Sequence, residues 1–152
     1  VAGRATPLGL AFATAPGRLV TACMPLAPNA ALLVRIGSRD VPARVGDASG
    51  TKGYCTLDAP ETGSWPLELA RALPAEGDKV YAARVAASGE VTLAEGRVDR
   101  IERAARGAVL ELSGEAARAE RGAPILDEQG RVAAMSRGDG RAVAIRARAS
   151  SG

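Results

Sequence analysis

The sequence contains no histidine among its 152 residues. Histidine is the side chain whose ordinary pKa lies nearest to neutral pH, so acid–base catalysis here has lost its usual residue. With no histidine and only two cysteines, a standard zinc site cannot be assembled from this chain alone. We therefore expect neither a metal nor another cofactor.

Aromatic residues and long apolar runs are also scarce. Aromatics make up only 3% of the chain, so the core must be aliphatic. The net charge of +3 comes from scattered arginines without interleaved aromatics, which argues against nucleic-acid binding. No apolar run reaches the roughly 18 residues needed for a membrane-spanning helix.

What the sequence does have is glycine, proline and alternating apolar segments. Eighteen glycines and nine prolines indicate many turns between short elements, which favours β structure. Strands recurring every 8 to 12 residues are typical of an all-β barrel or sandwich. The six residues Glu115 to Glu120 favour a helix but are too few to hold one unaided. The expected strands are Leu8–Thr14, Arg18–Ala22, Ala31–Gly37, Val41–Val45, Tyr54–Leu57, Lys79–Val85, Val91–Ile101, Ala108–Leu112, a hairpin from Pro124 onward, and Ala142–Ala147.

A stretch rich in proline, glycine and polar residues, about 58–74, separates two halves of the chain. We expect residues 1–152 to form one domain of two small β-barrels, at about 5–60 and 75–147, joined by this linker. The chain starts without methionine, which suggests an excised domain or a processed product. We expect no PDZ domain in it, and a monomer in isolation.

The segment from Glu120 to Pro124 is less ordinary than a simple turn. Glycine and proline stand close together in it and shape the backbone, and Arg121 lies in the middle. The alternative interpretation is that Arg121 is an ordinary solvent-exposed loop residue, as found in any small β-barrel.

The order of several motifs resembles trypsin-like serine proteases of the bacterial HtrA/Deg type. In that family a Gly-x-Gly-Phe strand and a Pro-x-Gly turn lead into Val-Thr-x-Ala-His. A Gly-Asp-x-Val strand, a Val-Thr-x-Gly-x-Val strand and the nucleophile loop Gly-Asn-Ser-Gly-Gly-Pro follow. The matching segments here are 9–26 (GLAFATAPGRLVTACMPL), 76–80 (EGDKV), 91–98 (VTLAEGRV) and 111–132, which contains AERGAP.

The resemblance implies two six-stranded antiparallel β-barrels and places the catalytic triad. Residue by residue, the histidine position is Met24 and the serine position is Arg121. The aspartate position is Gly53, or Lys52 if the register slips by one. The oxyanion loop corresponds to Ala119, Glu120, Arg121 and Gly122, with alanine where the family has the first glycine.

None of these replacements can do the original chemistry. A guanidinium stays protonated and cannot attack, a thioether has no titratable proton, and glycine has no side chain. Losing any one triad member costs on the order of 10⁴-fold or more in rate. Ser113, Ser136 and Cys55 are other possible nucleophiles, but no histidine is present to activate them. A serine–lysine pair using Lys52 or Lys79 is the remaining catalytic alternative.

The resemblance also brings the two cysteines together. Cys23 precedes the histidine position and Cys55 lies two residues after the aspartate position, where the family has small residues on neighbouring strands. Such positions can form a disulfide if their Cα atoms lie within about 7 Å. We expect a Cys23–Cys55 bridge; two buried free thiols are the alternative.

These features are typical of a pseudoprotease that binds a protein or peptide partner. Arg121 would then contact a partner carboxylate. A regulatory or structural domain of a larger protein is an alternative, and an unconventional hydrolase is the least favoured. The bridge and the family resemblance suggest a periplasmic or secreted location.

Overall fold

The chain folds almost entirely into β structure. The computed structural model describes residues 8–23, 31–36, 39–47, 53–62, 66–86, 88–104 and 107–145. No helix in these residues is long and apolar enough to cross a membrane. Their strands are β1 (Ala11–Ala15), β2 (Arg18–Thr21), β3 (Leu32–Ile36), β4 (Arg39–Val45), β5 (Cys55–Asp58), β6 (Lys79–Val85), β7 (Val91–Ala104), β8 (Gly107–Gly114), β9 (Pro124–Leu126), β10 (Val132–Ser136) and β11 (Arg141–Ala144).

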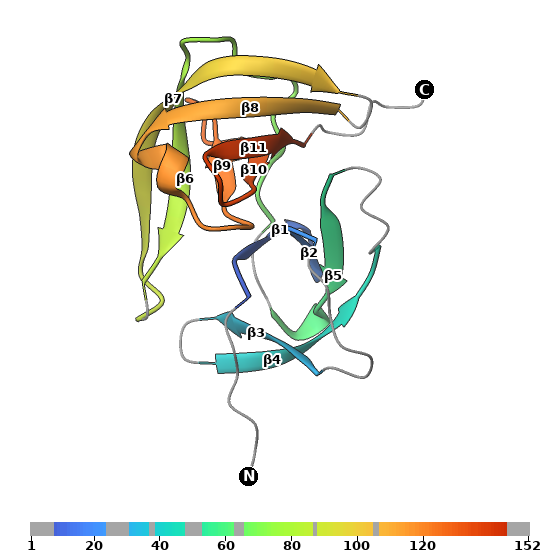
Figure 1. The fold of residues 1–152 in the computed structure, drawn as a ribbon. Helices are drawn as coiled ribbons and strands as arrows, with labels where there is room; N and C mark the ends of the chain where they lie inside the picture. The colour runs from blue at the N-terminus through green and yellow to red at the C-terminus, as the bar shows by residue number, and fades with distance from the viewer. Residues whose placement is uncertain are drawn as a thin grey trace.

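The second half of the chain forms a closed barrel, drawn in the upper part of Figure 1. Its six strands follow the order β10-β11-β8-β7-β6-β9, with antiparallel pairing throughout. Small and branched aliphatic side chains fill the interior, as the shortage of aromatics requires. The fully buried members of this core include Val80, Ala82, Leu110, Ile125, Ala134 and Ala142.

The first half forms an open sheet with the order β1-β2-β5-β4-β3. Its interior contains Ala13, Leu19 and Ala59, with Val34 and Leu57 packed against them. The all-β, two-barrel fold class is therefore confirmed, and the second barrel has the expected six strands. The first half differs in detail, because five strands rather than six are found in its described part.

A third apolar cluster holds the two halves together. Phe12 and Val20 from the first sheet pack with Met135 and Ile145 from the second barrel. The linker takes part as well: Leu69 forms an isolated parallel bridge with Val132, and the Leu67 amide donates to the Ala13 carbonyl at 2.8 Å. The linker is thus hydrogen-bonded to both halves instead of only connecting them.

Two local predictions show how side chains set the turns. The Asp127 carboxylate accepts the backbone N–H groups of Gln129 and Arg131, and Gly130 adopts a positive φ of 77°. Aspartate and glycine thus close the predicted hairpin between β9 and β10. The predicted helical segment forms only a 3₁₀ helix, η2 (Glu115–Arg118); a second one, η1 (Pro60–Thr62), follows β5.

Candidate functional site

The Arg121 loop connects the barrel core to the first sheet. It follows η2 and turns at Arg121 and Gly122 before entering β9. The Leu10 amide donates to the Arg121 carbonyl at 2.7 Å. The Leu10 carbonyl in turn accepts the Thr21 hydroxyl at 2.8 Å. The loop predicted to carry the nucleophile position is thereby tied to strands β1 and β2 of the other half.

Gly122 makes this close approach possible. Its φ is +90°, and a Cβ at this position would overlap the Leu10 carbonyl oxygen. Its amide donates inward to the Ser136 carbonyl at 2.9 Å. Only glycine combines that backbone conformation with that proximity.

Ser136 is the buried anchor of the loop, and sequence reasoning had considered it only as a possible nucleophile. Its hydroxyl donates to the Ala119 carbonyl at 3.2 Å and accepts the Gly138 amide at 3.0 Å. Its amide donates to the Ala123 carbonyl at 2.8 Å. With its side chain 3% exposed and its hydroxyl bonded both ways, Ser136 holds the loop in shape.

The Ala119 amide is hydrogen-bonded within its own segment. It donates to the Ala116 carbonyl at 3.2 Å, which caps η2. In an oxyanion hole, backbone N–H groups must point at the developing negative charge. In this conformation the Ala119 N–H is already used within its own segment.

Arg121 itself is exposed. Gly138, in the β10–β11 turn, lies against its backbone and Cβ. Within the described part of the chain, the guanidinium has neither an ion pair nor a hydrogen bond. Glu120, the preceding loop residue, is exposed as well. The loop therefore presents a cation on a tightly held backbone.

Gly53 lies against the same hairpin, from the opposite half of the molecule. Its φ is +85°, and a Cβ there would come within 2.7 Å of Val143 Cγ1 on β11. An aspartate at this position would need both a strained backbone and a displaced Val143. Two of the predicted positions, Gly53 and Arg121, therefore contact the same β10–β11 hairpin, at Val143 and Gly138 respectively. The other two, Met24 and Lys52, lie outside the described residues.

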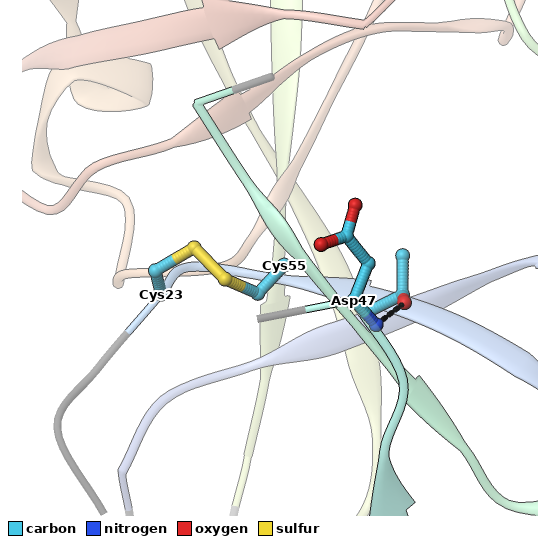
Figure 2. The surroundings of a disulfide bond; sticks show 4 residues. Cys23, Asp47 and Cys55 are labelled. Atoms are coloured by element: carbon cyan, nitrogen blue, oxygen red, sulfur yellow. Dashed lines mark hydrogen bonds between the residues drawn. A yellow bond between two sulfur atoms is a disulfide. The ribbon is translucent and has the colours of Figure 1, made fainter. Parts of the chain in front are cut away.

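The predicted disulfide is present. Cys23 and Cys55 are bonded across 32 residues of sequence, with their Cα atoms 5.0 Å apart (Figure 2). The bridge continues the β2–β5 pairing, in which Thr21 lies opposite Cys55. Cys55 therefore has no free thiol and is excluded as a nucleophile. The bridge ties Cys23, the neighbour of Met24, to the strand that follows Gly53.

Sequence reasoning missed Asp47 and Tyr54, two polar residues that lie near the disulfide. The Asp47 amide donates to the Thr56 hydroxyl at 2.7 Å, the dashed bond in Figure 2, and its carbonyl accepts the Thr56 amide at 3.0 Å. Burial, and then the charge of Asp47, raise the pKa of the nearby Tyr54 phenol. A pocket of about 370 Å³ opens here, lined by Thr14, Arg18, Val20, Asp47, Tyr54 and Ile145 among others. An acidic residue two positions after the predicted strand Val41–Val45 was its only sequence signal.

No metal site is apparent in the described ranges, where no three histidine, cysteine, aspartate or glutamate side chains gather. The polar turn Asp127–Gly130 uses its aspartate for the backbone bonds described above.

Residues 9–135 match the family model of the trypsin-like peptidase domain. Because this match spans most of the sequence, the chain belongs to the trypsin-like peptidase domain family. No curated protein is significantly similar to it.

Several solved structures share the fold. The active form of the Rv3671c protease from M. tuberculosis matches with a TM-score of 0.72 and 18% identity, over 88% of this chain and 67% of that one. Deg5 matches with a TM-score of 0.64 and 13% identity, over 90% and 76%. The MamO protease domain from Magnetospirillum magneticum gives 0.63 and 15%, over 91% and 82%. The predicted trypsin-like resemblance is thus confirmed, and Deg-type proteins share the fold.

The Gly122→Ala substitution tests the contact between the loop and the first sheet. We expect it to lower the free energy of unfolding by about 3 kcal/mol or more, since the new methyl group meets backbone that cannot turn aside. Gly130→Ala is the matched control: its φ is also positive, but nothing lies within 4 Å of its Cβ. That variant should lose only about 1 kcal/mol. Urea unfolding of both would measure the difference, and equal losses would contradict the role given to Gly122.

Removing the disulfide should destabilise the fold without changing the second barrel. For a loop of this length, the Cys23→Ala/Cys55→Ala double variant should lose about 3 to 4 kcal/mol of unfolding free energy. A reductant should lower the melting temperature of the wild type toward that of the variant and leave the variant itself unchanged. A reductant effect of equal size on both proteins would rule out the bridge as its cause.

Proposed function

We propose that this domain does not cleave peptide bonds and acts instead by binding a protein or peptide partner. The observation that carries the proposal is the absence of histidine from the whole sequence, including the 127 residues of the family match. Without an imidazole the chain lacks the group that takes the proton from the serine hydroxyl in a serine–histidine–aspartate triad.

The local geometry supports the same conclusion. The position aligned with the nucleophile carries a permanently charged guanidinium, which has no lone pair with which to attack a carbonyl. The aligned first donor of the oxyanion hole, the Ala119 amide, is bonded to Ala116. At the aligned aspartate position, Gly53 has a backbone and a neighbour that disfavour any side chain.

Binding is supported by what the loop retains. Gly122 and Ser136 hold its backbone in one shape, while Arg121 extends into solvent. A pre-organised arginine binds a carboxylate in a two-pronged geometry with little loss of entropy. We assign it a carboxylate of the partner, either an acidic side chain or a chain terminus.

The disulfide supports a location outside the cytoplasm. Bridges of this kind form and persist in oxidising compartments such as the periplasm or the extracellular space. We therefore propose that the partner is met in such a compartment.

Catalytic inactivity is tested by labelling with a fluorophosphonate, which reacts with activated serines. We expect no covalent adduct in the mass spectrum of the purified domain, and no hydrolysis of fluorescent casein above a heat-treated sample. An active trypsin-like protease is the positive control. An adduct on any serine, or hydrolysis that follows the domain through purification, would contradict the proposal.

The role of Arg121 is tested by charge reversal. The tagged domain and its Arg121→Glu variant would be cross-linked to extracytoplasmic proteins and the captured chains compared by mass spectrometry. We expect the partner captured by the wild type to be lost with Arg121→Glu. Arg103→Glu is the matched control, since Arg103 is an exposed arginine on β7. Equal capture by all three proteins would remove Arg121 from the interface.

A further inference from the structure

The β6–β7 hairpin carries an apolar patch on its surface. Val85, Val91 and Leu93 are 43%, 61% and 56% exposed. Val85 lies opposite Val91, and Leu93 follows two residues further along β7, so the three side chains share one face of the hairpin. We call these three residues the hairpin patch. Single apolar residues scattered over a surface are normal, whereas a contiguous group indicates an interaction site.

The hairpin patch faces away from the barrel interior. Ala94 and Val98 lie on the other face of β7 and are 2% and 1% exposed, and Val98 belongs to the barrel core. Figure 1 shows the β6–β7 hairpin extending beyond the rest of the barrel, at its lower left. The patch therefore lies on a projecting element, where a second molecule can reach it.

Opposite charges flank the hairpin patch. On the barrel side, Lys79 lies directly opposite Arg97, and like charges at facing positions destabilise a strand pair. Glu95, opposite Tyr81, lies between this pair and the patch, so the barrel side keeps a net positive charge. On the other side, the exposed Glu90 directly precedes the patch at the hairpin turn. Among the described residues, no ion pair involves Lys79, Glu90 or Arg97.

We propose that two copies of this chain associate through this face, with their hairpins stacked antiparallel about a two-fold axis near Leu93. A two-fold axis brings the same surface of both copies together, so that surface must be its own complement. The hairpin meets this condition, because an apolar centre separates an acidic end from a basic end. Two such faces match when they run in opposite directions.

The register of the hairpin gives the contacts across the axis. Leu93 of each copy packs on Leu93 of the other. On β6, Tyr81 and Val85 flank Ala83 symmetrically, so the Tyr81 ring of one copy covers Val85 of the other. On β7, the like-charged pair at the barrel side approaches Glu90 of the other copy, which offsets the repulsion within that pair.

The dimer is a weak one. Stable interfaces bury about 800 Å² on each partner, and one face of a two-stranded hairpin offers less than this. The monomer expected from the sequence therefore describes the chain at low concentration. Strand patterns predicted β6 and β7, but only the structure shows that this face of the hairpin is uncovered.

Sedimentation equilibrium of the full 152-residue chain tests the association. Between about 10 μM and about 1 mM, the average mass should rise from that of one copy toward that of two. A mass that stays at one copy throughout would overturn the proposal. Growth beyond two copies would overturn it as well, because a two-fold contact is closed.

The apolar centre is tested by Leu93→Thr. We expect this variant to associate at least about tenfold more weakly, because a symmetric dimer loses the leucine twice. Leu33→Thr on β3 is the matched control: Leu33 is 55% exposed, and its replacement should leave association within about twofold of the wild type. Threonine suits a strand, so both variants should fold. Equal weakening by both, or none by Leu93→Thr, would contradict the proposed interface.

The antiparallel stacking is tested by two charge-reversed variants. Glu90→Lys and Arg97→Glu should each self-associate at least about fivefold more weakly, since each brings like charges together across the axis. Mixed in equal amounts, they should form a heterodimer tighter than either homodimer, because both opposite-charge contacts are then restored. A loss of stability in either variant cannot produce this gain. A mixture that associates no more tightly than either homodimer would rule the stacking out.

This inference does not depend on the proposed lack of protease activity, and Arg121 is not part of the hairpin face. Arg121→Glu should therefore leave the concentration dependence of the mass unchanged. Loss of association in that variant would place the interface at the Arg121 loop and overturn the assignment to the hairpin. Self-association can thus fail while the result of fluorophosphonate labelling stands.

Discussion

The contact between Gly122 and the Leu10 carbonyl is the constraint on which the arrangement of the two halves depends. It leaves no room for a Cβ, and it brings the Arg121 carbonyl within 2.7 Å of the Leu10 amide. The cluster containing Phe12 and Met135 then seals the remainder of the interface. A loop held this tightly keeps its shape whatever side chain occupies its tip, because the hydrogen bonds involve backbone and the buried Ser136 hydroxyl.

Because the loop's backbone shape does not depend on the side chain at residue 121, a loop shaped like that of a protease can carry an arginine there. In this fold, backbone geometry and catalytic chemistry are supplied by different atoms, so the chemistry can be replaced while the geometry stays. The same argument applies to Gly53, the position predicted for the aspartate. There Gly53 allows a turn against Val143, and the Cys23–Cys55 bridge connects the adjacent strands. Under the proposed function, the site no longer transfers protons and instead binds a partner through a rigid surface from which the Arg121 guanidinium projects.

Much of the fold followed from local patterns. Lys79–Val85 was predicted to the residue as a strand, and the Asp127–Gly130 turn was predicted from its aspartate and glycine. These features depend on side chains close together in sequence. Ser136 is the opposite case: its sequence neighbours suggest only a strand residue, and its anchoring role exists because Ala119 and Gly138 reach it from separate segments. Asp47 and the pocket near Tyr54 were missed for the same reason.

The sequence by itself determined the absence of histidine, the aliphatic core, the succession of strands along the chain and, through the family resemblance, the partner of each cysteine. Composition and local periodicity carry that information. Only the tertiary structure decided that the Ala119 amide bonds to Ala116, that Gly53 abuts Val143, and that β9 pairs with both β6 and β10. These contacts depend on long-range packing, because the neighbour of a backbone group is set by which segment, distant in sequence, packs against it.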